Sequence, residues 1–217
     1  MKNFIYTSCV PRCVLEHYDK IDAEYIKNNE TKIVSEKIIY TCKDFSLSYD
    51  TRSKMLNLVF ENLVILDWDI IDGISKKSVV EILNRYLKYG ENINGIKRKE
   101  MCFKMYETKN GIHAYLISHK LHYKSDASIL LKNTLLTDVN HNLLCYRYGN
   151  MARITPKKEK DFIQKEGFNN IIYVGNIEHI DPYLLQLTDL IVHTQQFILS
   201  SGKSHQEIIN FLKNKDF

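Results

Sequence analysis

The chain has 217 residues, of which 44% are hydrophobic and 26% charged, an ordinary globular mix that is large enough to bury a core. It has no apolar run near the roughly 20 residues needed to cross a bilayer and no secretory signal, so we expect no membrane association. Five cysteines, an odd number, indicate free thiols in a reducing, intracellular compartment. A formal net charge of +4 permits nucleic-acid binding without demonstrating it.

Hydrophobic periodicity and turn residues predict alternating strands and helices. In chain order they are a helix over 22–27, a strand over 36–42, an apolar strand over 57–70 interrupted near Glu61, a helix over 76–89, strands over 101–107 and 112–118, a helix over 125–136, a strand or hairpin over 143–155, a strand over 171–174, and helices over 184–199 and 204–213.

Short-range signals support several of these elements. Ser75 and Gly90 fit the two caps of the helix over 76–89. Asn110 and Gly111 form the strongest short hairpin signal in the chain. The order predicts an α+β fold, with a mixed or antiparallel sheet, flanking helices and a helical C-terminal segment. We expect one domain over 1–217, with an N-terminal α/β part (1–56), a catalytic core (57–160) and a mostly helical segment (161–217).

The most informative segment is the apolar run that ends in Asp67 and Asp69. On a strand, residues two apart share a face, so the two carboxylates lie roughly 6.5–7 Å apart between Cα atoms, while Trp68 points away. Two such like charges repel each other unless a cation lies between them. The spacing therefore favours a site for one or two hard cations such as Mg²⁺ or Mn²⁺.

Further chemical groups follow in order along the chain. His113 lies just after the hairpin turn, Asp138 at the end of the helix over 125–136, and Arg153 and Lys157 in a downstream basic segment. Three carboxylates, one histidine and a basic set are what nucleotidyl transfer requires, since carboxylates hold metal ions and cations stabilise charge on the phosphates.

This order resembles the archaeo-eukaryotic primase superfamily, including its PrimPol-type members. The family shows an apolar strand ending in Asp-x-Asp/Glu, a Ser-x-His on a hairpin strand, an apolar-Asp motif and an Arg/Lys segment. The matching stretches here are Val64 to Asp69, Gly111-Ile112-His113, Leu136-Thr137-Asp138 and Arg153 to Lys157. The likeness covers roughly residues 60–158, and Gly111 stands where the family usually has Ser.

The resemblance implies an RRM-like catalytic core and a DNA primase or polymerase activity. By analogy, Asp67, Asp69 and Asp138 hold two Mg²⁺ or Mn²⁺ ions and are catalytic, His113 contacts the incoming nucleotide, and Arg153 with Lys157 contacts its phosphates. The expected substrates are a single-stranded DNA template and NTP or dNTP. Any helicase or other replication protein would be a separate chain. By the same analogy, small stand-alone relatives often belong to viruses or mobile elements. We expect an intracellular location, in the cytoplasm, the nucleus or a viral replication site.

Other interpretations of the same residues stay open. The Asp pair can be solvated residues at a strand end, Asp138 an ordinary turn residue, and Arg153 with Lys157 a solvated cationic edge strand. The whole chain can be an inactive nucleic-acid-binding module of the same fold, or a metal-dependent nuclease that uses the same acids. A structural Zn²⁺ site is the weaker alternative for the spacing of the ligand candidates Cys9, Cys13, His17 and Cys42.

Overall fold

The computed structural model describes residues 36–69, 75–108, 111–155, 171–200 and 203–215. Its elements are β1 (Glu36–Thr41), β2 (Ser46–Asp50), β3 (Met55–Phe60), β4 (Ile65–Asp69), α4 (Lys76–Tyr89), the 3-10 turn η1 (Arg98–Glu100), β5 (Cys102–Glu107), β6 (Gly111–Leu116), α5 (Asp126–Thr134), α6 (Val139–Tyr148), β7 (Asn150–Arg153), β8 (Ile171–Gly175), the 3-10 turn η2 (Ile177–His179), α7 (Pro182–Leu199) and α8 (His205–Lys213).

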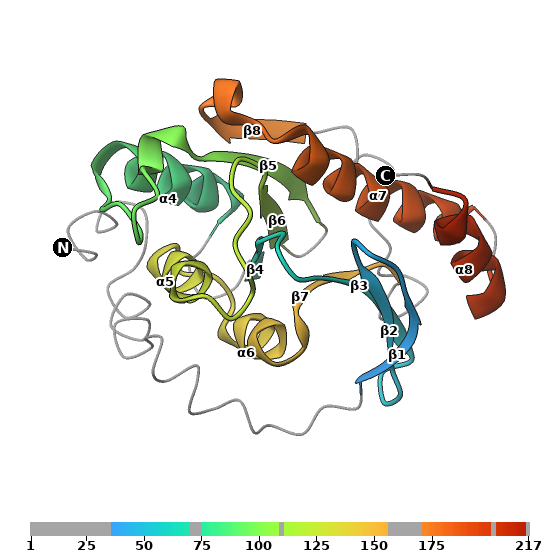
Figure 1. Cartoon of the computed structure of the whole chain (residues 1–217). Helices are drawn as coiled ribbons and strands as arrows, with labels where there is room; N and C mark the ends of the chain where they lie inside the picture. The colour runs from blue at the N-terminus through green and yellow to red at the C-terminus, as the bar shows by residue number, and fades with distance from the viewer. Residues whose placement is uncertain (1–35, 70–74, 109–110, 156–170, 201–202, 216–217) are drawn as a thin grey trace.

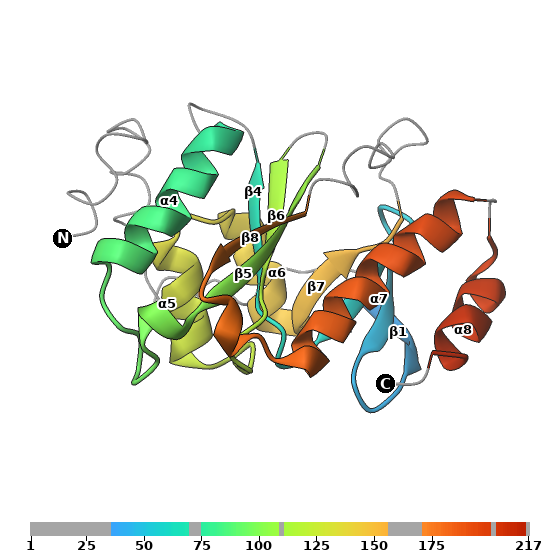
Figure 2. The ribbon, with the colours of Figure 1, turned by 90° about the horizontal axis from the view of Figure 1, so that it is seen from above.

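Two antiparallel four-stranded sheets with flanking helices confirm the α+β class. The first sheet has the order β1-β2-β3-β7 and the second the order β4-β6-β5-β8. Because β6 pairs antiparallel with both β4 and β5, those two strands run parallel, and α4 connects them. Figures 1 and 2 show α4 and α5 on one side of the second sheet and α7 on the other.

Two apolar cores hold these layers together. One core lies between the second sheet and the helices α4 and α5, and it contains Trp68 and Phe103. The other joins the opposite face of that sheet to the first sheet and to α7 and α8, with Leu58 and Leu187 among its buried members. Both faces of the second sheet are therefore covered by apolar side chains. Polar side chains at the ends of its strands need hydrogen-bond or charged partners, because burying them unpaired is costly.

The helix termini follow from the sequence. Ser75 accepts a hydrogen bond from the Ser78 backbone at the start of α4, and Gly90 donates to the Tyr86 carbonyl at its end. Asp181 caps α7 directly before Pro182, whose fixed φ suits the first turn of a helix. No helix in the described part of the chain is both long and apolar enough to span a bilayer.

Two expectations from the sequence are wrong in detail. The apolar stretch 57–70 is not one interrupted strand, because β3 belongs to the first sheet and β4 to the second. The expected strand or hairpin over 143–155 is the C-terminal part of α6 followed by β7. Gly149, where the turn of such a hairpin would lie, instead ends α6 with φ +113°, a conformation that favours glycine. The expected helix over 22–27 lies outside the described residues.

Candidate active site

The acidic end of β4 places two carboxylates on one face of the second sheet. Trp68 is 1% exposed and points into the core on the other face, where its indole N–H donates to the Leu135 carbonyl at 2.9 Å. Asp67 and Asp69 flank it, the first half-buried and the second exposed. The packed indole therefore fixes the part of β4 from which both carboxylates project.

His113 lies directly opposite Asp67 on the neighbouring strand β6, and Nε2 of the histidine is 3.2 Å from Oδ1 of the aspartate. Burial alone would raise the pKa of Asp67. The adjacent His113, with smaller contributions from His141 and Arg153, outweighs burial and holds that pKa well below its usual range. Asp67 is thus ionised at neutral pH.

Asp138 lies beside Asp67, although it does not end the helix over 125–136 as expected. It is the N-cap of α6, where Oδ1 accepts the His141 backbone N–H at 2.6 Å. Its own backbone N–H donates to the Asp67 carbonyl at 2.7 Å. Burial, and then the nearby Asp67 and Asp138 carboxylates, raise the pKa of Asp69. The charges of Asp67 and Asp138 therefore both reach Asp69 through space.

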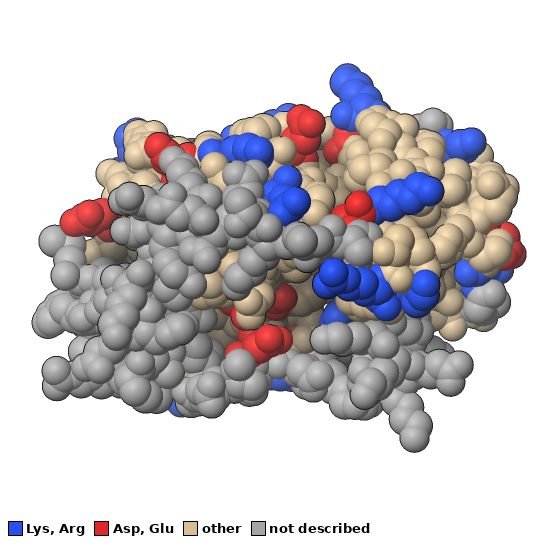
Figure 3. All heavy atoms as spheres, turned by 90° about the horizontal axis from the view of Figure 1, so that it is seen from below, with Lys and Arg blue, Asp and Glu red and all other residues tan. Residues whose placement is uncertain are grey.

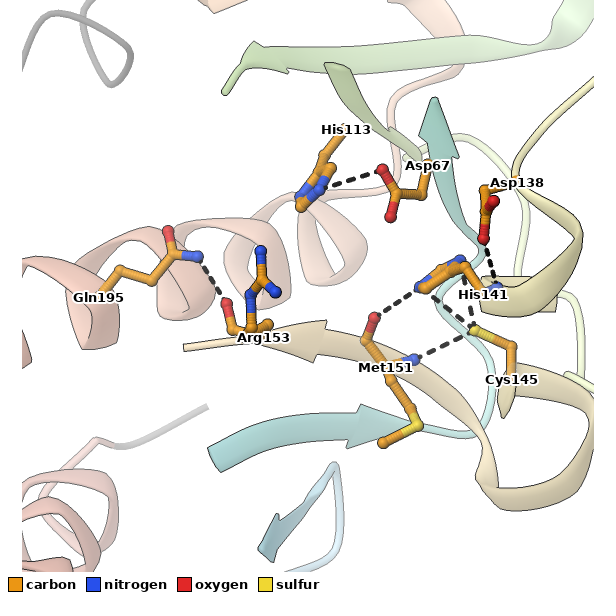
Figure 4. A network of polar contacts seen from close by, with 8 residues as sticks. All are labelled: Asp67, His113, Asp138, His141, Cys145, Met151, Arg153 and Gln195. Atoms are coloured by element: carbon orange, nitrogen blue, oxygen red, sulfur yellow. Dashed lines mark hydrogen bonds and ion pairs between the residues drawn. The ribbon is translucent and has the colours of Figure 1, made fainter. Parts of the chain in front are cut away.

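Arg153, the last residue of β7, approaches the acids from the first sheet. Figure 4 shows its guanidinium extending toward the space beside His113 and Asp67. Its charge helps to lower the pKa of Asp67 and opposes the rise at Asp69. The side chain is exposed, and Nη1 contacts the Met55 sulfur at 3.8 Å.

Behind these residues lies a buried polar cluster that the sequence does not predict. His141 Nε2 lies 3.5 Å from Cys145 Sγ and 3.1 Å from the Met151 carbonyl. Lys132 is 3% exposed, and its ammonium donates to the Asn150 side chain at 2.6 Å. The one sequence signal for this cluster is the four-residue spacing of His141 and Cys145. That spacing puts both side chains on one face only if the segment is recognised as a helix.

The charges in this cluster are mutually dependent. Burial lowers the pKa of His141 and raises that of Cys145, but their attraction to each other is stronger. The thiolate raises the pKa of His141 to about 9, and His141 and Lys132 lower the pKa of Cys145 to about 6. The mutual attraction therefore favours an imidazolium at His141 beside a thiolate at Cys145, on the helix that Asp138 caps.

The structure brings together five of the six predicted site residues. They are Asp67, Asp69, His113, Asp138 and Arg153. Lys157 lies outside the described residues, as do Cys9, Cys13 and His17 of the possible zinc site. The thiol of Cys42, the fourth member of that set, instead donates to the Phe45 carbonyl at 3.4 Å.

The arrangement favours binding of a charged ligand. Figure 3 shows acidic side chains near the centre of one face, with Lys and Arg side chains above them and to their right. Within the described ranges, no three His, Cys, Asp or Glu residues form a ready ligand set for one metal ion. Comparison of the chain with protein-family models, with curated proteins and with solved structures gave no match.

Proposed function

We propose that this protein is a metal-dependent nucleotidyltransferase of the DNA primase or polymerase type. It would make or extend a primer on single-stranded DNA from nucleoside triphosphates. The observation that carries the proposal is the proximity of three acids to one another and to two basic side chains. Asp138 is hydrogen-bonded to Asp67 through the backbone, and Asp69 is close enough for both charges to raise its pKa. His113 contacts Asp67, and Arg153 extends toward them. These residues lie up to 86 positions apart in the sequence and come from β4, β6, β7 and the start of α6.

The carboxylates suit Mg²⁺ or Mn²⁺. Hard divalent cations prefer carboxylate oxygens. Burial, and then the charges of Asp67 and Asp138, raise the pKa of Asp69, and a cation would relieve that repulsion. Asp67 and Asp138 each use Oδ1 in a hydrogen bond or ion pair, and no partner contacts their Oδ2 among the described residues. When bound, such ions neutralise phosphate charge and activate the attacking hydroxyl.

The chain's own residues would do the rest. His113, whose Nε2 contacts Asp67, would donate a hydrogen bond to the triphosphate from Nδ1 as an imidazolium, in which both ring nitrogens are donors. Arg153 would bind the phosphate oxygens of the incoming triphosphate, since an arginine binds phosphate oxygens through two parallel N–H groups. The template strand would cross the same face, and strand separation would come from a different protein.

The arrangement of the second sheet supports the RRM-like part of the proposal. Strands β4 and β5 are parallel, α4 connects them, and β6 lies between them, which is a split β-α-β unit. The acids lie at the carboxyl end of β4, its first strand. The edge strand β8 pairs with β5, on the side of the sheet away from these acids.

The test is primer synthesis and extension on single-stranded DNA with Mg²⁺ or Mn²⁺ and labelled NTPs or dNTPs. Wild type is compared with the double variant Asp67→Ala/Asp69→Ala and with Glu91→Ala, which removes an exposed acid after α4. Product from wild type and from Glu91→Ala, with none from the double variant, would support the transferase.

Two other results would overturn it. Cleavage of DNA without added nucleotides, lost in the double variant, would indicate a metal-dependent nuclease. Equal binding of single-stranded DNA by both proteins, with no product from either, would indicate a nucleic-acid-binding module without this chemistry.

A further inference from the structure

Strand β7 has one edge that no strand covers among the described residues. It pairs with β3 on one side and is the last strand of the first sheet. On the other side, side chains from two helices bond its backbone. The Met151 N–H contacts Cys145 Sγ at 3.5 Å, and the Met151 carbonyl accepts from His141 at 3.1 Å. Two residues on, the Arg153 carbonyl accepts a hydrogen bond from Gln195 Nε2 at 2.8 Å. Side chains from α6 and α7 therefore take the place of a neighbouring strand.

Gln195 is an unusual residue for its position on α7. Its neighbours on the buried face, Ile191 and Ile198, belong to the second apolar core, yet Gln195 is itself only 7% exposed. Burying an amide without a hydrogen bond is costly, so its contact with the Arg153 carbonyl compensates for its burial. Figure 4 shows the amide reaching from α7 to the end of β7.

The side chain of Arg153 itself has little to fix its direction. Its one polar contact with the described residues is the weak sulfur acceptor of Met55. The backbone around it is well held: the Ile154 N–H donates to the Leu56 carbonyl at 2.9 Å, and Gln195 holds the carbonyl of Arg153. The backbone held in this way therefore fixes the point from which the Arg153 side chain extends.

We propose that Gln195 is a positioning residue, which fixes the end of β7 so that Arg153 faces Asp67 and His113. The inference deepens the proposed function and rests on it, because it assigns to α7 the orientation of the phosphate-binding arginine. A residue of the C-terminal helical segment thus belongs to the site, 42 positions after the residue that it orients.

The test compares Gln195→Met, which keeps the length of the side chain and removes the donor, with Gln196→Met at the exposed neighbouring position. We expect the apparent KM for the triphosphate and its Kd, measured with a fluorescent nucleotide, to rise about tenfold in Gln195→Met, because one buried hydrogen bond is lost. We expect kcat to change less than about twofold and Gln196→Met to match wild type. In an Arg153→Ala background, Gln195→Met should add no further loss, since the two residues act together.

Each outcome decides a separate point. If Arg153→Ala weakens nucleotide binding while Gln195→Met behaves as wild type, the positioning role is wrong and the proposed function stands. The positioning role is equally wrong if Gln195→Met lowers kcat and leaves KM and Kd unchanged. If wild type neither binds a triphosphate nor extends a primer, the proposed function fails, and the inference with it. Should Gln195→Met fail to fold, Gln195→Leu carries the test, since its shorter apolar side chain also cannot donate a hydrogen bond.

Discussion

Asp67 and His113 are directly opposed residues on β4 and β6, and their side chains meet at 3.2 Å. The pairing holds both side chains in place without help from a loop, since each lies within a strand of the second sheet. It also explains why Asp67 stays ionised although it is half-buried. The low pKa of the Asp67 carboxylate depends on His113, so a substitution at His113 should also change the pKa of Asp67.

Replacing His113 with Ala should reduce primer extension by about 10²-fold, as expected when one hydrogen-bond donor to a developing charge is removed. It should also raise the pKa of Asp67, because the contact with His113 is what opposes burial there. Steady-state kinetics of extension and a carboxyl NMR titration measure the two effects. His193→Ala, at an exposed position on α7, is the control and should leave both unchanged. Full activity in His113→Ala would exclude a role for this histidine.

Replacing Gly111 with Ser should not restore a missing functional group. A Cβ at this position would lie 2.2 Å from the Trp68 carbonyl oxygen, which is backbone and cannot move aside cheaply. We expect Gly111→Ser and Gly111→Ala to lower the free energy of unfolding by about 1–3 kcal/mol each, as overpacking does, measured by urea denaturation. A Ser variant as stable as wild type and more active would show that the hydroxyl matters more than the close strand contact.

Much of the fold could be predicted from the sequence where local signals agree with tertiary packing. The capped helix α4 and the strands β5 and β6 lie close to their expected bounds, and Trp68 and its two flanking acids occupy the opposite faces that strand alternation requires. These signals are short-range, because they depend on caps, turns and a two-residue period.

The parts that could not be predicted depend on distant contacts. The segment after Asp138 mixes apolar and polar residues without a clear period, so its pattern does not predict a helix, although an Asp N-cap and a Gly C-cap are present. His141 and Gln195 owe their roles to backbone atoms 10 and 42 residues away. No pattern in the sequence records such a pairing.

The ion pair between Lys104 and Asp189 gives a prediction about stability alone. Lys104 is 2% exposed on the side chain, and its ammonium contacts Asp189 Oδ1 at 2.6 Å and Thr188 Oγ1 at 3.2 Å. Asp189→Ala leaves a buried charge without its partner, whereas Lys104→Met removes the charge and keeps most of the volume. We expect urea denaturation to show a loss of about 1–3 kcal/mol for Asp189→Ala and a smaller change for Lys104→Met. A larger loss of stability for Lys104→Met than for Asp189→Ala would mean that this ion pair does not hold α7 against β5.

The thiol of Cys145 should ionise with a midpoint near pH 6, because His141 and Lys132 stabilise its thiolate against burial. Thiolate ultraviolet absorbance followed against pH measures this. The step should vanish in Cys145→Ser and persist in Cys102→Ser, since burial alone acts on Cys102 and raises its pKa. A step near pH 6 that survives in Cys145→Ser would assign it to another group.

The pair formed by Cys145 and His141 also predicts how the stability of the fold depends on pH. The pKa of Cys145 is depressed from 9.0, so the stability from its ionisation is present above pH 9 and is lost as the pH falls through about 6. The pKa of His141 is raised from 6.5, so its contribution is present below pH 6.5 and is lost as the pH rises through about 9.

Between these limits the two slopes oppose each other, because folding moves a proton from the thiol to the imidazole without releasing it. Urea denaturation from pH 6.5 to 9 should therefore show little pH dependence from this pair. In Cys145→Ser the compensating slope is gone, and His141, buried without its thiolate, should make the protein less stable as the pH falls through 6.5. An unchanged pH profile in that variant would contradict an ionised pair.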